Sequence, residues 1–187
     1  IPFKSLSCNF AACALDFRGS SGGVYYIDAQ AATADDTLHI TSFATRVETV
    51  LLVKGNVDIA ATIDINTGEG DFLAVISSGD IMLNRSVGDT TPSCPPDSHV
   101  EGFFSADLDI VIDGAKNCTL GPDRMLGIQG AVVANAARLG GSLKLNRTLC
   151  DTNRTHPVLT ITERPDMILS APEFLKQQNF IWREVVP

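Results

Sequence analysis

The sequence predicts an all-β protein: a single-domain, irregular right-handed β-solenoid, similar to a β-helix, with extruded loops and a C-terminal capping tail. The first observation is a strand–glycine–strand pattern that occurs at residues 50–59 and again at residues 72–83. Its central glycines, Gly55 and Gly79, are 24 residues apart, a spacing typical of one solenoid coil. The second observation is composition: only 19% of the residues are charged, and small and β-branched residues are abundant, which suits stacked strands better than helices.

Each further element follows from the local pattern of apolar residues. Residues 38–41 alternate apolar and polar side chains, as a half-buried strand does, whereas residues 47–53 are nearly all apolar and suit a central strand. Looser copies of the repeat follow at residues 103–112 and 126–145. Strands are expected at residues 24–27, 38–41, 47–53, 57–59, 63–65, 72–83, 103–112, 126–134, 142–145 and 160–163.

Two segments interrupt the strands and are expected as loops extruded from the coils. Residues 85–99 contain three prolines, which exclude a strand inside a sheet. Residues 113–122 form the second loop and carry Cys118. Helix signals are weak, and the sequence predicts a single helical turn at residues 171–177, with Pro172 at its start.

These patterns divide the chain into an N-terminal arm at residues 1–22, a solenoid domain at residues 23–157 and a C-terminal capping tail at residues 158–187. The arm is rich in apolar residues and is interpreted as a lid over the first coil. Two alternatives are one or two amphipathic helical turns, or a donor segment that packs on a neighbouring subunit. The chain begins without Met, which suggests a processed or truncated product.

The charge balance bears on the classes of partner. The chain has 14 Lys and Arg residues and 22 Asp and Glu residues, which gives a formal net charge of −8. It lacks the basic face that phosphates require, so no nucleic-acid partner is expected. No run of 18 apolar residues exists, so no membrane span is expected in this segment. The acidity suits a soluble surface protein or one that meets divalent cations.

The five cysteines serve as a marker of the redox compartment. They form no CxxC pattern and lie far in sequence from the three histidines, so neither a metal site nor another cofactor is expected. Two disulfides and one odd thiol are predicted: Cys8 with Cys13 in the N-terminal segment, and Cys94 with Cys118 between the two loops. The alternative is that all five are reduced, buried apolar residues. Disulfides are typical of secreted proteins.

Four Asn-x-Ser/Thr sequons occur, where the composition alone would give about one. They begin at Asn84, Asn117, Asn146 and Asn153, near expected strand ends or loops. One interpretation is N-glycosylation of a surface protein. The other is that Asn and Thr favour the corners and turns of a solenoid.

A succession of C-terminal motifs matches a known pattern: GAVVA at residues 130–134, LKLNRTL at 143–149, NRTHP at 153–157, RPDMIL at 164–169 and WREVVP at 182–187. It resembles the β-solenoid domains that close large secreted bacterial surface proteins, some of them pilin-like. Those domains typically end with an Arg-Pro-Asp segment and a Trp-x-Glu-Val-x-Pro tail. The resemblance covers roughly residues 22–187 and implies location and shape rather than activity. The cysteines and the arm depart from that pattern, so a self-assembling subunit is an alternative to the end of a larger protein.

The tail carries a candidate clamp. Arg164 is expected to pair with Asp166 or Glu184 and so pin the tail to the solenoid. Trp182 is expected to cover the open end of the core, because an exposed solenoid end requires a cap. Stacking of Trp182, Tyr25 or Tyr26 on a sugar ring is the alternative.

Scattered carboxylates are the remaining chemical candidates. Asp107 and Asp109 fall on one side of an expected strand, and Asp58 and Asp80 are expected at similar outward positions on neighbouring coils. Such carboxylates suit Ca²⁺ binding, or general acid and base catalysis on a polysaccharide. A solvated polar face is the favoured interpretation. No hydrolytic triad is evident, so no catalytic residue and no enzymatic activity are expected.

Together these inferences predict an extracellular structural protein at the cell surface, as a subunit of a filament, a pilus-like appendage or a surface layer. Self-assembly is expected through the N-terminal arm and the solenoid ends, because open ends and unpaired strand edges favour stacking. The alternative is an adhesin-type binding module that recognises glycans or a partner surface.

Overall fold

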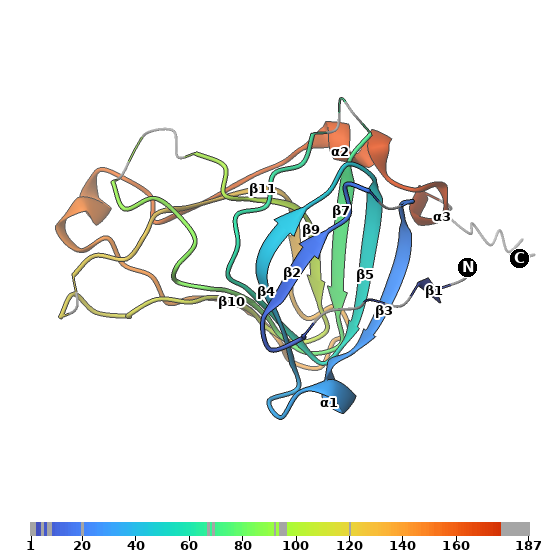
Figure 1. The fold of residues 1–187 in the computed structure, drawn as a ribbon. Helices are drawn as coiled ribbons and strands as arrows, with labels where there is room; N and C mark the ends of the chain where they lie inside the picture. Colours follow the sequence, from blue (N-terminus) through green and yellow to red (C-terminus); the bar gives the residue numbers. More distant parts are fainter. Residues whose placement is uncertain are drawn as a thin grey trace, which may run out of the picture.

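The chain folds as a β-solenoid built from two parallel sheets (Figure 1). The computed structural model describes residues 3–4, 6, 9–19, 21–66, 68, 70–91, 93, 97–119 and 121–176. Every pair of neighbouring strands in the two sheets is parallel. The prediction of an all-β solenoid is therefore confirmed.

Among the described residues the two sheets have seven and six strands. In sheet A the order is β1 (Phe3–Lys4), β3 (Gly23–Asp28), β5 (Glu48–Lys54), β7 (Phe72–Ser77), β9 (Val100–Ala106), β11 (Leu126–Val133) and β13 (Leu159–Thr162). In sheet B the order is β12 (Leu143–Leu145), β10 (Ile110–Ile112), β8 (Ile81–Leu83), β6 (Asn56–Ile59), β4 (Thr37–Ala44) and β2 (Cys13–Asp16). The helices are α1 (Ala29–Ala32), α2 (Pro165–Ser170), α3 (Glu173–Lys176) and the 3₁₀ helix η2 (Cys150–Arg154).

The strand–glycine–strand repeat corresponds to successive coils. Strands β5 and β6 flank Gly55, and strands β7 and β8 flank Gly79 in the next coil. The N–H of Gly79 donates to the carbonyl oxygen of Gly55 at 3.0 Å, so the two corners stack. Gly55 has a φ of +120°, and a Cβ there would lie 2.5 Å from the carbonyl oxygen of Asp36. The corner therefore requires glycine.

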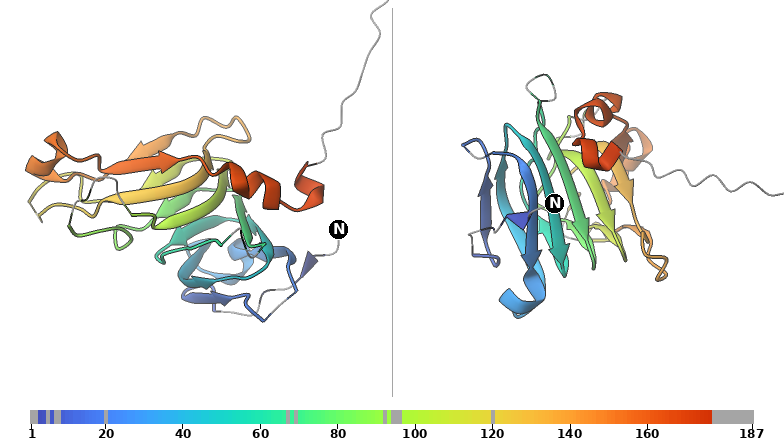
Figure 2. Two further views of the ribbon diagram at one scale, coloured as in Figure 1. Left: turned by 90° about the horizontal axis from the view of Figure 1, so that it is seen from above. Right: turned by 90° about the vertical axis from the view of Figure 1, so that its right-hand side faces the viewer.

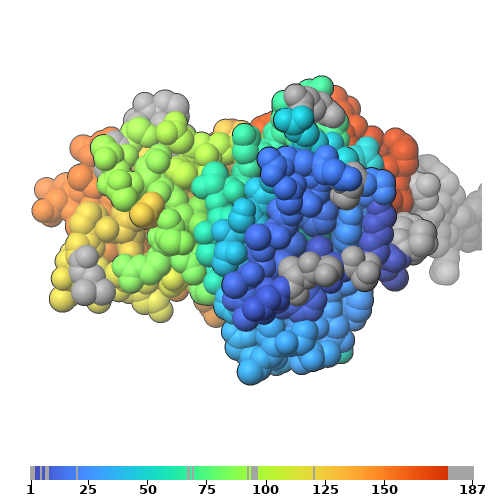
Figure 3. Space-filling model, in the orientation of Figure 1, coloured from blue at the N-terminus to red at the C-terminus, as the bar shows by residue number. Residues whose placement is uncertain are grey.

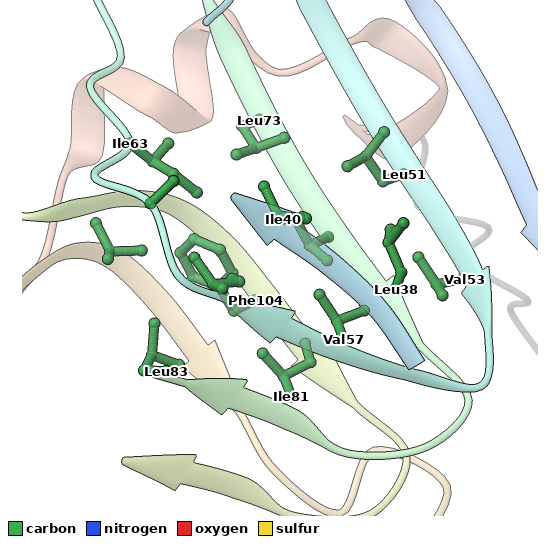
Figure 4. Close-up of a cluster of buried hydrophobic side chains, with 14 of the residues drawn as sticks. Leu38, Ile40, Leu51, Val53, Val57, Ile63, Leu73, Ile81, Leu83 and Phe104 are labelled. Carbon is green, nitrogen blue, oxygen red and sulfur yellow. The ribbon is translucent and has the colours of Figure 1, made fainter. Parts of the chain in front are cut away.

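The core lies between the sheets and consists of columns of aliphatic side chains in register (Figure 4). Parallel pairing places equivalent residues of successive coils directly beside each other, so each column adds one buried side chain per coil. In sheet B one column contains Leu38, Val57, Ile81, Ile110 and Leu143. A second contains Ile40, Ile59, Leu83, Ile112 and Leu145.

The N-terminal segment differs from the expected irregular arm over residues 13–17. Residues Cys13–Asp16 form β2, which pairs with β4 as the last strand of sheet B. Cys13, Leu15 and Phe17 are buried and alternate with exposed residues, a period of two that belongs to a strand. Ala11 and Ala12 before the strand and Ala14 within it are also apolar, which gave the helical pattern in the sequence.

Two further elements differ from expectation. Residues 63–65 form only an isolated bridge between Ile63 and Val100, because the N–H of Ile65 donates to the side chain of Glu101 rather than to a neighbouring strand. Helix α2 was not predicted, although Pro165 begins it, a favoured helix-start position. The predicted turn after Pro172 is confirmed as α3.

The coils carry additions on two sides. Helices α2 and α3 lie on the outer face of sheet A (Figure 2). The described parts of residues 84–99, 113–125 and 146–158 connect strands of sheet B to the next strands of sheet A. They project from this corner of the solenoid, and we call them the loop lobe (Figure 1 and Figure 3). The predicted loops at residues 85–99 and 113–122 belong to this lobe.

Candidate functional site

The C-terminal end of the solenoid leaves core side chains open to solvent. In sheet B, Leu143 continues the inward column of Ile110, and Leu145 continues that of Ile112. Ile110 and Ile112 are 0% exposed, whereas Leu143 is 45% and Leu145 is 48% exposed. The columns therefore end on a surface that no further coil covers among the described residues.

Sheet A ends in the same way. Ile161 on β13 is in register with Ile128 on β11, and it is 41% exposed while Ile128 is buried. Strands β12 and β13 are the last strands of their sheets at this end. We call Leu143, Leu145 and Ile161, together with the outer edges of β12 and β13, the open end.

The N-terminal end of the solenoid is covered instead. Strand β2 buries Cys13 and Leu15 at this end, and Leu6 and Phe10 from the preceding segment pack against the core. The interpretation of residues 1–22 as a lid over the first coil stays a prediction, because residues 13–16 form a strand of the solenoid and residues 7 and 8 lie outside the described residues. The two ends of the solenoid therefore differ in chemistry, one covered and one apolar and accessible.

One corner of the solenoid is held by side-chain to backbone hydrogen bonds between coils. The N–H of Asp80 donates to Asn56 Oδ1 at 2.9 Å, and the N–H of Asp109 donates to Asp80 Oδ1 at 2.9 Å. The N–H of Ser142 donates to Asp109 Oδ1 at 2.8 Å. We call these four residues the corner ladder. Lys144 donates to Asp109 Oδ2, and this bond lowers the pKa of Asp109.

The corner ladder gives Asp80 and Asp109 structural partners. Asp58 is in register with Met82 rather than with Asp80, so the expected stack of outward carboxylates on neighbouring coils is wrong. Asp58 lies within a strand, whereas Asp80 precedes one and turns toward the corner. In the part of the chain that the structure describes, no group of three or more His, Cys, Asp and Glu residues is arranged to hold a metal ion.

His39 joins two coils on the outer side of sheet B. Its Nε2 lies 2.8 Å from Asp35 Oδ2, and its Nδ1 lies 3.1 Å from Asp58 Oδ2. Asp58 is buried and also accepts a hydrogen bond from Asn84 Nδ2 at 3.2 Å. Partial burial opposes the charged imidazolium, but the bonds to the two carboxylates outweigh it and raise the pKa of His39. The protonated ring therefore ties the two carboxylates together.

The loop lobe is organised by a buried arginine that the sequence did not reveal. Arg147 is 5% exposed, and burial lowers the pKa of its guanidinium to about 10. Its three nitrogens donate over 2.7–3.1 Å to the backbone carbonyl oxygens of Asn84, Val87, Asp113 and Arg124. Two of these acceptors belong to residues 84–99 and two to residues 113–125, so Arg147 ties its own segment to the other two segments of the loop lobe.

Asp123 is a second buried charge in the lobe. It accepts hydrogen bonds from the N–H of Ala115 at 3.1 Å and from the N–H of Thr148 at 3.0 Å. Arg85 lies at 3.8 Å from the same carboxylate. Single charged residues in irregular loops have no periodicity, so sequence reasoning could not distinguish Arg147 and Asp123 from exposed neighbours.

A disulfide closes the loop lobe. Cys118 is bonded to Cys150, with Cα atoms 5.8 Å apart. The prediction that Cys118 forms a disulfide is confirmed, but the predicted pairing with Cys94 is wrong, because the loops after β10 and β12 leave adjacent parallel strands and run together. Cys94 itself lies outside the described residues. Cys13 is also disulfide-bonded, and its predicted partner Cys8 lies outside the described residues.

The four sequons occupy different environments. Asn84 is partly buried and its side-chain nitrogen is bonded to Asp58, and Asn146 is also partly buried. Asn153 is exposed, and its Nδ2 donates to the side-chain oxygen of Thr148 at 2.9 Å. Asn117 is exposed in the loop lobe. Glycosylation remains a prediction, and exposure favours Asn117 and Asn153 over Asn84 and Asn146.

The tail clamp forms between Arg164 and two carboxylates. Arg164 donates to Asp166 at 2.6 Å, and it also bonds Glu101 on β9 at 3.0 Å. The bonds to Asp166 raise the pKa of Arg164. The clamp therefore fixes the start of α2 onto sheet A. Trp182 and Glu184, the other two predicted members, lie outside the described residues.

No family model, curated protein or solved structure matches this chain. Within the described residues, no helix is both long and apolar enough to cross a membrane. The features that bear on function are therefore the open end, the disulfides and the surfaces of the solenoid.

Proposed function

We propose that this chain is an extracellular structural protein that assembles with copies of itself into a cell-surface filament, a pilus-like appendage or a surface layer. The observation that supports this most is the open end, where columns of the core stop at solvent-accessible Leu143, Leu145 and Ile161. The Cys118–Cys150 disulfide supports a non-reducing compartment.

Parallel strands favour head-to-tail contact over a symmetric one. In sheet B the outermost strands are β12 at the open end and β2 at the covered end. A second copy translated along the solenoid axis would place its β2 beside β12 in the same direction, which continues the parallel ladder. A contact that repeats by translation does not close, so it generates a filament.

Burial of the open end supplies the driving force. Leu143, Leu145 and Ile161 each have roughly half of their side-chain surface left to bury, which corresponds to about 1 kcal/mol per residue. Backbone hydrogen bonds along the edges of β12 and β13 would add to this, since an unpaired edge is a template for another strand. The covered N-terminal end of the next copy would form the surface that packs against the open end.

Sedimentation over a concentration series, combined with negative-stain electron microscopy, tests the proposal. The wild-type protein is expected to form particles larger than the 19.9 kDa chain, with ordered fibres at high concentration. The double variant Leu143→Asp/Leu145→Asp is expected to remain monomeric, because charges would replace the apolar contact. The matched control is Leu169→Asp, a residue 80% exposed on α2, which should assemble like the wild type.

Two outcomes would reject the proposal: a wild-type protein that stays monomeric at every concentration, or a double variant that assembles as well as the control. The first would redirect attention to the adhesin-type alternative, for which binding to a glycan array is the decisive assay.

A further inference from the structure

Both faces of sheet A are apolar: the inner face that lines the core and the outer face that points away from it. Side chains on alternate positions of the strands point away from the core and form two rows in register. One row contains Val24, Val50, Ala74, Phe103 and Ala131. The other contains Tyr26, Leu52, Ile76, Ser105 and Val133. A sheet of this kind requires cover on both faces.

Helices α2 and α3 cover only part of this face (Figure 2). Ala171 belongs to a buried cluster on this face, and Phe174 packs against that cluster, whose other members are Val24, Val50, Phe72 and Ala74. The remaining surface is hollowed into three neighbouring cavities of about 460, 410 and 320 Å³. Ile76 lines all three, and we call them together the outer groove.

The lining of the outer groove is mainly aliphatic and aromatic, and the polar residues Lys54, Ser77, Ser78 and Asp107 are grouped at the cavity of about 410 Å³. Its largest cavity lies between α3 and Phe103, Val133 and Ile168. The other two are lined by Phe3 and Leu52, with Tyr26 at one of them. The largest and the smallest of these cavities suit a large apolar side chain rather than water, because few polar groups line them.

The chain leaves α3 at the rim of this groove. Leu175 and Lys176, the last residues of the described chain, both line the largest cavity, and Leu175 also lines the smallest. Residues 177–187 follow, and they contain the consecutive apolar residues Phe180, Ile181 and Trp182. Position 182 is six residues beyond Lys176, and six extended residues span about 20 Å. The distance from β7 to β3 is two strand spacings, about 10 Å.

We propose that the segment at residues 177–187 docks in the outer groove of its own chain, with Trp182 as the main anchor. Attachment to α3 gives the segment an effective concentration in the millimolar range at the groove. A separate partner of equal affinity would need a higher concentration than this to displace it. A tryptophan side chain buries a large apolar area and is the residue type most suited to anchor such a contact. The groove lies on the outer face of sheet A, so this contact is independent of assembly through the open end.

Trp182 is the only tryptophan of the chain, so intrinsic fluorescence of the whole protein reports on this residue alone. In the wild type, its emission is expected to be blue-shifted from that of N-acetyltryptophanamide and protected from acrylamide quenching. Leu52→Asp places a charge in the groove. It is expected to shift the emission maximum toward that of N-acetyltryptophanamide and to remove most of the protection from acrylamide quenching. Leu169→Asp, which lines none of the three cavities, should leave both signals unchanged.

Three results would overturn the proposal. Wild-type emission equal to that of the free compound would show that Trp182 is not docked. A blue shift that disappears on dilution would assign the groove to a second copy. A shift caused by Leu145→Asp but not by Leu52→Asp would place Trp182 at the open end instead.

A deletion after Lys176 provides a measurement that does not depend on a groove variant. Removal of residues 177–187 is expected to increase binding of an apolar dye such as ANS relative to the intact chain, while the far-ultraviolet circular dichroism stays that of the solenoid. If Leu52→Asp alters the circular dichroism, Ile76→Ser replaces it as the groove variant. Equal dye binding by the deleted and intact chains would contradict the proposal.

Discussion

Replacement of Arg147 by methionine removes the cation that holds the loop lobe. Methionine keeps much of the apolar stem but provides no donor, so four backbone carbonyl oxygens each lose one hydrogen bond. A hydrogen bond to a charged group contributes about 1.5–3 kcal/mol, but water would reach part of the opened lobe and reduce the sum. We expect the free energy of unfolding to fall by about 3–5 kcal/mol, well below the sum for four such hydrogen bonds.

Thermal and urea unfolding measure this effect. A change of 1 kcal/mol shifts the melting temperature of a domain of this size by about 2–4 °C, so a decrease on the order of 10 °C is expected. Arg147→Lys should be intermediate, because an ammonium cannot reach acceptors spread around a planar guanidinium. The control is Arg154→Met, an exposed arginine in the same lobe. Equal stability of Arg147→Met and Arg154→Met would refute the assigned role of Arg147.

Three further predictions concern other parts of the fold. Because the pKa of His39 is raised in the folded state, the stabilisation that its protonated ring provides is complete below about pH 6.5 and is lost as the pH rises through the pKa of the folded protein. Denaturant titrations should therefore show a smaller loss of stability from pH 6 to 8 in His39→Gln than in the wild type. The Cys118–Cys150 bond spans 32 residues, and Cys150→Ser should cost up to about 4 kcal/mol by the loop-entropy relation; an unchanged urea midpoint would argue against that bond. A Cβ at Gly130 would lie 2.0 Å from a backbone oxygen on β9, so Gly130→Ala should destabilise by about 1–3 kcal/mol, while Gly19→Ala, with open space around it, should melt like the wild type.

The coil architecture could be predicted because it has a repeating signature. Gly55 and Gly79 occupy equivalent corners, and apolar residues flank each of them. One short pattern therefore predicted both strands of a coil and the corner between them. The C-terminal strand and the turn after Pro172 carried equally local signals. Strand β2 was harder to predict, because Ala11, Ala12 and Ala14 gave a helical as well as an alternating apolar pattern.

The contacts between loops could not be predicted, because they depend on which loops the coils bring together. Cys118 pairs with Cys150 since the two loops follow adjacent strands, and only the register of β10 and β12 shows this. The arrangement around Arg147 has the same origin. By contrast, the partners Arg164 and Asp166 are two residues apart, so their ion pair was accessible from the sequence.

The corner ladder has a direction along the chain. At each step the N–H of the later coil donates to a side chain of the earlier coil, from Asn56 through Asp80 and Asp109 to Ser142. When a coil folds, the side-chain oxygen that accepts its N–H is therefore already in place on the preceding coil. This order suits folding from the N-terminus while a ribosome or a secretion channel is still delivering the chain. Loss of the last coil leaves every earlier step complete, whereas loss of the first removes the template. Truncations from the two termini should accordingly have unequal effects on folding.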